Sequence, residues 1–316
     1  MTKTRIFMTS DVHGSDKTFR KFVSAGPFYK ADVVIVGGDL TGKRIIPIVN
    51  QKDGSYKANF YDKVVTMRSE KEIADLEQQI KDAGFYYTRL DNEQVAKLSD
   101  EEEVEKLFSE LMIERIREWI NLLDKHMEGK KIRCYVQPGN DDRFVIDPML
   151  DEAKNIINPE GNVIKIDESH EMISTGFSNI TPWKCPRDIP EEDLEKKIEA
   201  MTSKVENMEN CIFNFHVPPY DTSIDYAPRL TEDLKVVTEG GAPSMIPVGS
   251  KAVRKSIDTH QPLLGLHGHI HESRGIHRLG RTLCVNPGSE YSEGILRGVI
   301  VNLSDGKIKD YTFTSG

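Results

Sequence analysis

The stretch Arg5-Ile6-Phe7-Met8-Thr9-Ser10-Asp11-Val12-His13-Gly14 contains a short apolar run that ends abruptly in polar residues and a glycine. A short apolar run of this kind, followed by a turn and by the amphipathic residues 16–25, is typical of a buried strand that leads into a crossover helix. We therefore expect a strand–loop–helix unit whose loop carries Asp11 and His13.

Four other apolar runs end in the same way, in a polar cluster. These clusters are Gly37-Gly38-Asp39, Pro138-Gly139-Asn140-Asp141-Asp142, His216-Val217-Pro218-Pro219 and His267-Gly268-His269-Ile270-His271. The expected strands are 5–8, 32–36, 132–136, 211–215 and 262–266, with two more at 282–285 and 298–303. Helical spacing of apolar residues over 102–127 and 194–208 predicts core-facing helices between them. The alternation favours an α/β (α+β) fold.

The composition is that of a globular protein that does not span a membrane. The 316 residues include 42 basic and 51 acidic side chains, which gives a net charge of −9, and 38% of the residues are hydrophobic. The acidic balance argues against a broad basic face for nucleic acid. No apolar stretch approaches the ~20 residues of a membrane span, and the first residues do not resemble a signal peptide.

The four cysteines are far apart and form no CxxC pair, which excludes zinc-ribbon and thioredoxin motifs. Cys134, Cys211 and Cys284 lie in apolar runs, where we expect them to pack as small hydrophobic residues. A cytoplasmic location is the expectation that follows.

Residues 43–131 separate the second polar cluster from the third. This segment begins with an expected hairpin, formed by 45–49, a turn at Lys52-Asp53-Gly54, and 56–65. A charged helix over 70–84 and the long helix 102–127 follow. We interpret 43–131 as an insertion in a single domain that covers 1–316, either as a cap over the site or as an addition beside it.

The polar clusters share one chemistry. Ligands at the carboxyl ends of strands meet at one edge of an α/β sheet. Two carboxylates, one amide oxygen and four imidazoles suit borderline divalent ions such as Mn, Fe, Zn or Co. Seven ligands are too many for one ion with an open position, and they suit two ions that share a carboxylate. The seven are Asp11, His13, Asp39, Asn140, His216, His269 and His271.

In this order, the five clusters resemble the signature blocks of the calcineurin-like metallophosphoesterase superfamily, over 11–289. The resemblance implies a two-layer β-sandwich flanked by helices, and two divalent ions, with Mn favoured. It implies that one ion is bound by Asp11, His13 and His271, and the other by Asn140, His216 and His269. Asp39 would bridge them. The implied reaction is hydrolysis of a phosphate ester by metal-activated hydroxide.

One position departs from the family pattern. Many members have a histidine directly after the asparagine of the third block, where it assists the leaving group, whereas this chain has Asp141. An ionised Asp141 would repel a phosphomonoester dianion, and a protonated Asp141 would act as the acid. We prefer a weakened acid role and a diester or activated ester. We also name His267 as a candidate catalytic residue, in a supporting or structural role beside the metal ligands.

Candidate substrate contacts are weaker. Lys43 or Arg44 would hold a phosphate oxygen, with a solvated surface charge as the alternative. Asn286 and Ser289 belong to an Asn-Pro-Gly-Ser loop that is common in the family, where support of the site is the other interpretation. Gly249-Ser250 would offer amides to an anion or simply cap the helix 251–257. Tyr220 and Asp221 are candidates for the pocket wall.

Two functions of different classes follow from this pattern. The first is a binuclear-metal phosphoesterase that acts on a small phosphodiester or nucleotide-type substrate, with nucleic acid disfavoured. The second is a metallophosphoesterase-fold scaffold that binds a protein partner. Scaffolds tend to lose ligands, and all seven positions here hold competent residue types. The amphipathic segments are also compatible with a homodimer.

Overall fold

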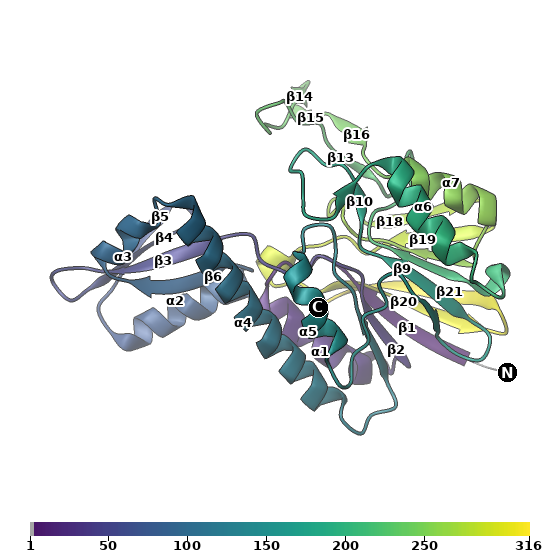
Figure 1. Ribbon diagram of the computed structural model, residues 1–316, viewed down its shortest axis with the longest axis horizontal. Helices are drawn as coiled ribbons and strands as arrows, with labels where there is room; N and C mark the ends of the chain where they lie inside the picture. Colours follow the sequence, from purple (N-terminus) through teal and green to yellow (C-terminus); the bar gives the residue numbers. More distant parts are fainter. Residues whose placement is uncertain (1–2) are drawn as a thin grey trace.

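Two β-sheets that pack face to face form the body of the protein (Figure 1). The structure is a computed structural model and describes residues 3–316. In the first sheet, β1, β2 and β7 are parallel neighbours, and β20 runs antiparallel between β1 and β21. Its spatial order is β21 (Lys307–Ser315), β20 (Arg297–Ser304), β1 (Lys3–Thr9), β2 (Val33–Val36) and β7 (Arg133–Val136).

The second sheet has a parallel centre. β9, β12, β17 and β19 run parallel, and β8 and β18 pair antiparallel at its two edges. Its spatial order is β18 (Gly275–Leu279), β19 (Thr282–Asn286), β17 (Leu264–Leu266), β12 (Ile212–Phe215), β9 (Glu171–Thr175) and β8 (Val163–Lys165). The seven strands expected around the polar clusters are thus present, with ends that differ by a few residues at most.

The alternation of side chains along each strand builds three layers of core. Ile6 and Met8 point between the sheets, where they belong to the same cluster as Ile212 from the second sheet. Phe7 points the other way, into the core under the helices α1 (Asp16–Tyr29) and α4 (Glu101–Met127).

On the far side, α6 (Glu191–Thr202) and α7 (Lys251–His260) cover the outer face of the second sheet, where Phe213 and Phe215 are buried. The expected two-layer sandwich flanked by helices is confirmed.

The helical stripes end differently from the expectation. The apolar stripe of α4 is buried against α1 as expected, with Ile116, Trp119 and Leu123 in the core. α6 stops at Thr202, however, so Val205 and Met208 lie beyond the helix, although both still pack against the same core.

Residues 43–131 form a sheet of their own and three helices, drawn at the left of Figure 1. The spatial order of the strands is β5 (Lys63–Met67), β4 (Tyr56–Phe60), β3 (Ile45–Asn50) and β6 (Tyr86–Leu90), and the helices are α2 (Glu70–Asp82), α3 (Asn92–Lys97) and α4. β6 and α3 were not expected.

The expected strand 56–65 was wrong, because a two-residue turn at Tyr61 and Asp62 divides it into β4 and β5. Both turn residues have positive φ, 51° and 58°, which is the geometry of a tight hairpin turn.

Smaller elements complete the chain. Near the site, a two-stranded arm projects from the body, formed by β13 and β16 and extended by β14 and β15 (Figure 1). The strands of the arm are β13 (Tyr226–Pro228), β14 (Thr238–Glu239), β15 (Ala242–Pro243) and β16 (Met245–Pro247). The other small elements are α5 (Asp147–Asp151), β10 (Ser178–Asn179) and β11 (Asp188–Ile189). None of the helices within residues 3–316 combines the length and the apolarity that crossing a membrane requires. Cys134, Cys211 and Cys284 are buried, as expected.

Candidate metal centre

The carboxyl ends of strands from both sheets meet at one edge of the sandwich. Asp11, Asp39 and Asn140 follow β1, β2 and β7, while His216 and His269 follow β12 and β17. The structure therefore brings together side chains that are far apart in sequence. Asp11, His13, Asp39, Asn140 and His216 are at most 3% exposed, and His269 and His271 are half-buried.

The loops that carry these residues adopt strained backbone conformations. Asp11, His13, Asp39 and His269 all have positive φ, between 37° and 65°. Residues other than glycine rarely adopt such angles, and they cluster at functional sites. The first two loops also hold each other, since the amide of His13 donates to the carbonyl of Asp39 at 2.9 Å.

Two glycines make this close approach possible. Gly38 has a φ of 125°, and a Cβ atom there would lie 2.4 Å from Nδ1 of His216. A Cβ atom on Gly268 would lie 2.5 Å from a carboxylate oxygen of Asp11. Side chains at either position would push ligand residues apart.

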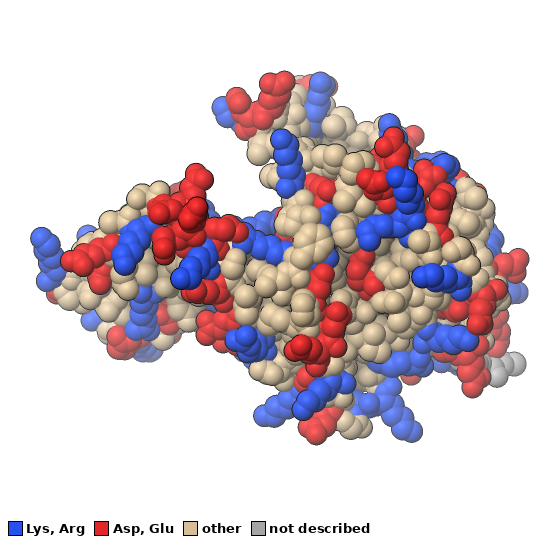
Figure 2. Space-filling view, in the orientation of Figure 1, with Lys and Arg blue, Asp and Glu red and all other residues tan. Residues whose placement is uncertain are grey.

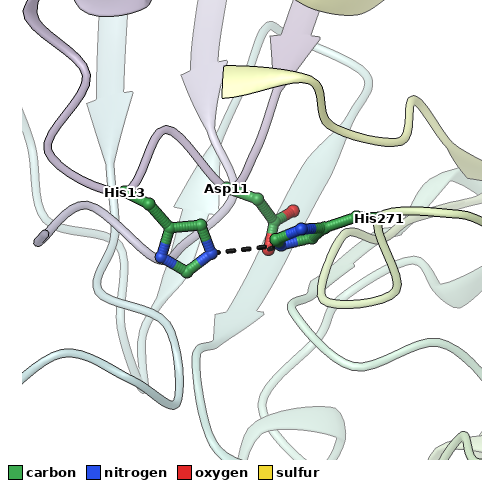
Figure 3. A group of neighbouring side chains, drawn as sticks. All are labelled: Asp11, His13 and His271. Carbon is green, nitrogen blue, oxygen red and sulfur yellow. Dashed lines mark hydrogen bonds and ion pairs between the residues drawn. The ribbon is translucent and has the colours of Figure 1, made fainter. Parts of the chain in front are cut away.

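The first group of side chains comprises Asp11, His13 and His271 (Figure 3). Nε2 of His13 lies 3.1 Å from Nε2 of His271, and Nε2 of His271 lies 3.4 Å from Oδ1 of Asp11. One ligand atom from each residue lies within 4.8 Å of the others, which is close enough for a single ion to contact all three.

The second group centres on Asp39, whose two carboxylate oxygens face opposite ways. Oδ2 lies 3.5 Å from Nε2 of His13, in the first group, and Oδ1 lies 3.4 Å from Nε2 of His216. His269 completes the second group, and the backbone amide of His269 donates to the Asp11 carboxylate at 3.0 Å. Asp39 thus lies between the groups, as a shared ligand would.

The electrostatics of the site favour cations. Burial disfavours the charged form of His216, yet the neighbouring Asp39 and Asp11 carboxylates outweigh burial and raise the pKa of His216 to about 10. Burial, with a smaller contribution from Lys43, lowers the pKa of His13 to about 3. Burial, with the charge of His216, lowers the pKa of His269 to about 4. His13 and His269 are therefore neutral near pH 7, which is the form that binds metal.

Unpartnered buried side-chain atoms are a second observation that fits a site for divalent ions. Oδ1 of Asn140 and Nε2 of His216 are buried without a hydrogen-bond partner, and Nε2 of His216 lies 3.4 Å from Oδ1 of Asp39. Buried polar atoms are nearly always satisfied, so two unpartnered side-chain atoms of ligand type at this edge of the sheets fit a cation site.

Asp141 is held by two donors at the mouth of the site. Nζ of Lys43 lies 2.5 Å from Oδ2 of Asp141, and the thiol of Cys185 donates to Oδ1 at 2.9 Å. Burial opposes the charge on Lys43, but Asp141 and then Asp39 outweigh it and raise the pKa of the ammonium. Each oxygen of Asp141 therefore accepts from one donor, a lysine on Oδ2 and a thiol on Oδ1.

Two carboxylates whose roles sequence reasoning missed, the buried Asp142 and the half-buried Asp188, fix the third block. Asp142 accepts hydrogen bonds from the backbone amides of Gly139, Leu40 and Thr41, which joins the second and third loops. Burial, with the charge of Asp39, raises the pKa of Asp142 to about 6.

Asp188 accepts from Nδ2 of Asn140 at 2.9 Å and thereby leaves Oδ1 of Asn140 directed at the site. Asp142 belongs to the polar cluster 138–142, so its place near the site could be predicted. Nothing in the sequence around Asp188 indicates that it contacts Asn140.

Several expected contacts lie elsewhere. His267 is fully buried, and its Nδ1 bonds the carbonyl of Phe215 at 2.8 Å, so it supports the strand and does not line the cavity. Asn286 is also fully buried, and its side chain bonds the carbonyls of Gly268 and Ile270.

Ser289 and Arg44, which were candidates for substrate contact, also lie outside the lining of the cavity. Ser289 donates to the carbonyl of Asp11, and Arg44 is exposed and does not line the cavity. These contacts agree with the supporting role given to His267, with the supporting interpretation of Asn286 and Ser289, and with a solvated charge on Arg44; they speak against direct catalytic or substrate contact by these side chains. Lys43 does line the cavity.

The amides at the start of α7 are already occupied. The carboxylate of Glu191 accepts from Ser250 Oγ and from the amides of Lys251 and Ala252. An external anion would have to displace this carboxylate, so the capping interpretation holds and the anion site is wrong. Tyr220 lines the cavity, and Asp221 does not. Tyr291, which sequence reasoning missed, packs its ring 4.7 Å from that of His13.

Relatives of known sequence or structure agree with this architecture. An uncharacterized protein of Methanocaldococcus jannaschii is 35% identical over 153 residues, which cover 48% of this chain and 61% of that relative. A crystal structure from Thermus thermophilus aligns with a TM-score of 0.54 and 16% identity, over 100% of this chain and 99% of that one. Another solved structure has a TM-score of 0.55 and 17% identity, over 98% of each chain. At these identities, the solved structures show the fold alone.

The sequence profile of the calcineurin-like phosphoesterases matches residues 4–273. The match takes in all five polar clusters at the sheet edge, so the resemblance seen in the sequence is confirmed. The chain belongs to the calcineurin-like phosphoesterase family.

Proposed function

We propose that the protein is a binuclear-metal phosphoesterase that hydrolyses a small phosphate ester, with diesters preferred. The observation that carries this proposal is Asp39, whose two carboxylate oxygens face one histidine from each of the two groups of candidate ligands. Asp11, His13 and His271 would hold one ion, and Asn140, His216 and His269 the other. Two divalent ions, with manganese favoured, would neutralise phosphoryl oxygens and make a water available as nucleophile near neutral pH.

Side chains at the mouth of the site support the preference for diesters. The Lys43 ammonium offers positive charge to a phosphoryl oxygen, and Asp141 beside it adds a negative charge. A phosphomonoester dianion meets more repulsion from Asp141 than a diester monoanion does. An ionised Asp141 also holds no proton for the leaving group, which favours esters of acidic alcohols.

Smaller features support the wider assignment. Residues 43–131 bury an apolar core of their own that includes Ile46 and Leu76, and α4 of the same segment packs Trp119 into the core under the first sheet, in keeping with an insertion in one domain. Figure 2 shows basic and acidic side chains interspersed over the face drawn, which favours a small substrate over nucleic acid. The four free cysteines support a cytoplasmic location.

Hydrolysis of bis(p-nitrophenyl) phosphate by the full chain with Mn²⁺ tests this function. We expect turnover that exceeds the rate on p-nitrophenyl phosphate and that falls to background in Asp39→Asn. The control Asp62→Asn, in the exposed turn of 43–131, should keep full activity. Bound metal without turnover on either ester would contradict the proposal and favour a scaffold.

A further inference from the structure

The candidate metal centre opens into a cavity of about 780 Å³ that extends well beyond the metal ligands. Its inner end is lined by Asp39, Asn140 and His269. Pockets for drug-sized ligands measure roughly 300–1,000 Å³, so the space accommodates a sizeable organic group beside a phosphoryl group. The outer part of the cavity would therefore contact the organic group of the ester and influence which esters bind.

Apolar side chains from three segments wall the outer part. Ile180 and Trp183 project from the loop after β10, Tyr220 follows β12, and Leu230 and Ile246 come from the arm. Trp183 is 62% exposed and Ile180 is 59% exposed, so both side chains offer accessible apolar surface on the wall of the same cavity. Nζ of Lys251 lies 5.4 Å from the centre of the Tyr220 ring.

Polar side chains in the outer wall are mostly engaged within the protein. Thr181 Oγ1 donates to Asp188, and Asn179 Nδ2 donates to the carbonyl of Val248. Glu191 is held by the start of α7, and Thr231 Oγ1 accepts from the amide of Lys235. A nucleobase or sugar needs free partners for its polar edges, and among the lining side chains the engaged groups leave mainly the exposed charges of Lys251 and Glu272.

The loop that carries Trp183 is also tied to the metal centre. The carboxylate of Asp188 accepts from the amides of Thr181 and Cys185, and from the side chain of Asn140. The apolar wall is thus fixed relative to a proposed metal ligand, which is what a specificity surface requires.

From these contacts we propose that the outer cavity selects phosphate esters whose organic group is apolar and ring-sized, such as an aryl group, over esters of nucleosides, sugars or peptides. This inference rests on the proposed phosphoesterase function and names its substrate class. The phosphoryl group lies at the inner end, near Lys43, and the ring lies between Trp183, Tyr220 and the arm.

Binding of phosphonates tests the proposal without turnover, because a phosphoesterase does not hydrolyse their C–P bonds. Calorimetry on the full chain with Mn²⁺ would compare methylphosphonate, benzylphosphonate and the methylene phosphonate analogue of adenosine 5′-phosphate. We expect benzylphosphonate to bind about tenfold more tightly than methylphosphonate, since stacking and apolar burial of one ring are of that order. The nucleoside phosphonate should have no such advantage.

Variants separate a specificity wall from a structural one. Trp183→Ala should remove most of the benzyl advantage, and Ile180→Ser, at another exposed position, should reduce it. Phe28→Ala, at an exposed position on α1 outside the cavity, should keep the wild-type ratio.

Equal affinities for benzylphosphonate and methylphosphonate would overturn the proposal, and so would tightest binding of the nucleoside phosphonate. A loss in Trp183→Ala that is the same for both small phosphonates would also overturn it. If the benzyl preference appears but no ester is hydrolysed, the proposed function fails and the apolar binding site stands. If esters are hydrolysed without the preference, the reverse holds.

Discussion

The Nζ atom of Lys43 lies 2.5 Å from Oδ2 of Asp141, at the position where many family members have a histidine. The pair brings a fixed positive and a fixed negative charge to the mouth of the site. A histidine there would be able to carry a proton to the leaving group, whereas Asp141 accepts from a donor on each of its oxygens. The pair thus links the sequence departure to substrate preference.

Replacing Asp141 tests this link. Asp141→His removes a negative charge and adds a group that is able to donate a proton. We expect the ratio of kcat/KM for p-nitrophenyl phosphate to that for bis(p-nitrophenyl) phosphate to rise about tenfold, since ~1.4 kcal/mol of reduced repulsion corresponds to that factor. Asp141→Asn removes the charge alone, so a larger effect of His than of Asn isolates the proton donor. Unchanged rates on both esters in both variants would refute this role of Asp141.

The carboxylate of Asp188 positions Asn140 by accepting a hydrogen bond from the side-chain amide of Asn140. Asp188→Ala frees the amide to rotate, so Oδ1 is no longer directed at the site, and we expect Mn²⁺ affinity to fall about 10- to 100-fold. Calorimetric titration with Mn²⁺ measures the change. Asp193→Ala, on the exposed face of α6, is the matched control and should keep the wild-type affinity. Wild-type affinity in Asp188→Ala would show that Asn140 does not depend on this contact.

Asp167 gives a prediction about stability, away from the metal centre. Its carboxylate accepts from the amides of Ser169 and His170 and from Thr4 Oγ1. Burial opposes ionisation, but the Thr4 hydroxyl, the Ser169 amide and the His170 side chain, whose Nδ1 lies 2.8 Å from the carboxylate, outweigh it, so the pKa of Asp167 lies below the ordinary value of an aspartate. A lowered carboxylate pKa stabilises the folded state above the unfolded-state pKa, and that contribution is lost as the pH falls through the folded-state pKa.

We therefore expect Asp167→Asn to lower the free energy of unfolding by about 1–3 kcal/mol at pH 7, as for other buried hydrogen bonds that are left unpaired. The difference from wild type should stay constant down to about pH 5 and shrink below about pH 4. Urea unfolding at several pH values measures it. A difference that grows as the pH falls would contradict the assignment.

The position of the centre could be predicted because each strand carries its own signal. The apolar run before Asp11 and the one before Asp39 each end in a polar cluster, and parallel strands bring such ends together. No long-range information was needed for that step. Local spacing alone does not separate His267 from His269, which are two residues apart; the resemblance to the family gave His267 a supporting or structural role, and its ring contacts the carbonyl of Phe215.

The remaining features depend on contacts between distant segments. Asp188 and Glu191 look like ordinary loop and helix acids, and their partners Asn140 and Ser250 are 48 and 59 residues away. The hairpin turn at Tyr61 and Asp62 contains no glycine, so the sequence reads as one continuous strand there. Nothing in the sequence around Trp183 indicates that it lines the same cavity as the candidate metal ligands.

The number of metal ions per chain tests the central claim most directly. Metal-free protein titrated with Mn²⁺, followed by elemental analysis after removal of free metal, should contain two ions per chain. Hydrolysis of bis(p-nitrophenyl) phosphate should rise with the second equivalent, because Asp39 faces both groups of ligands. One ion per chain at saturation, or full activity after the first equivalent, would contradict the binuclear centre.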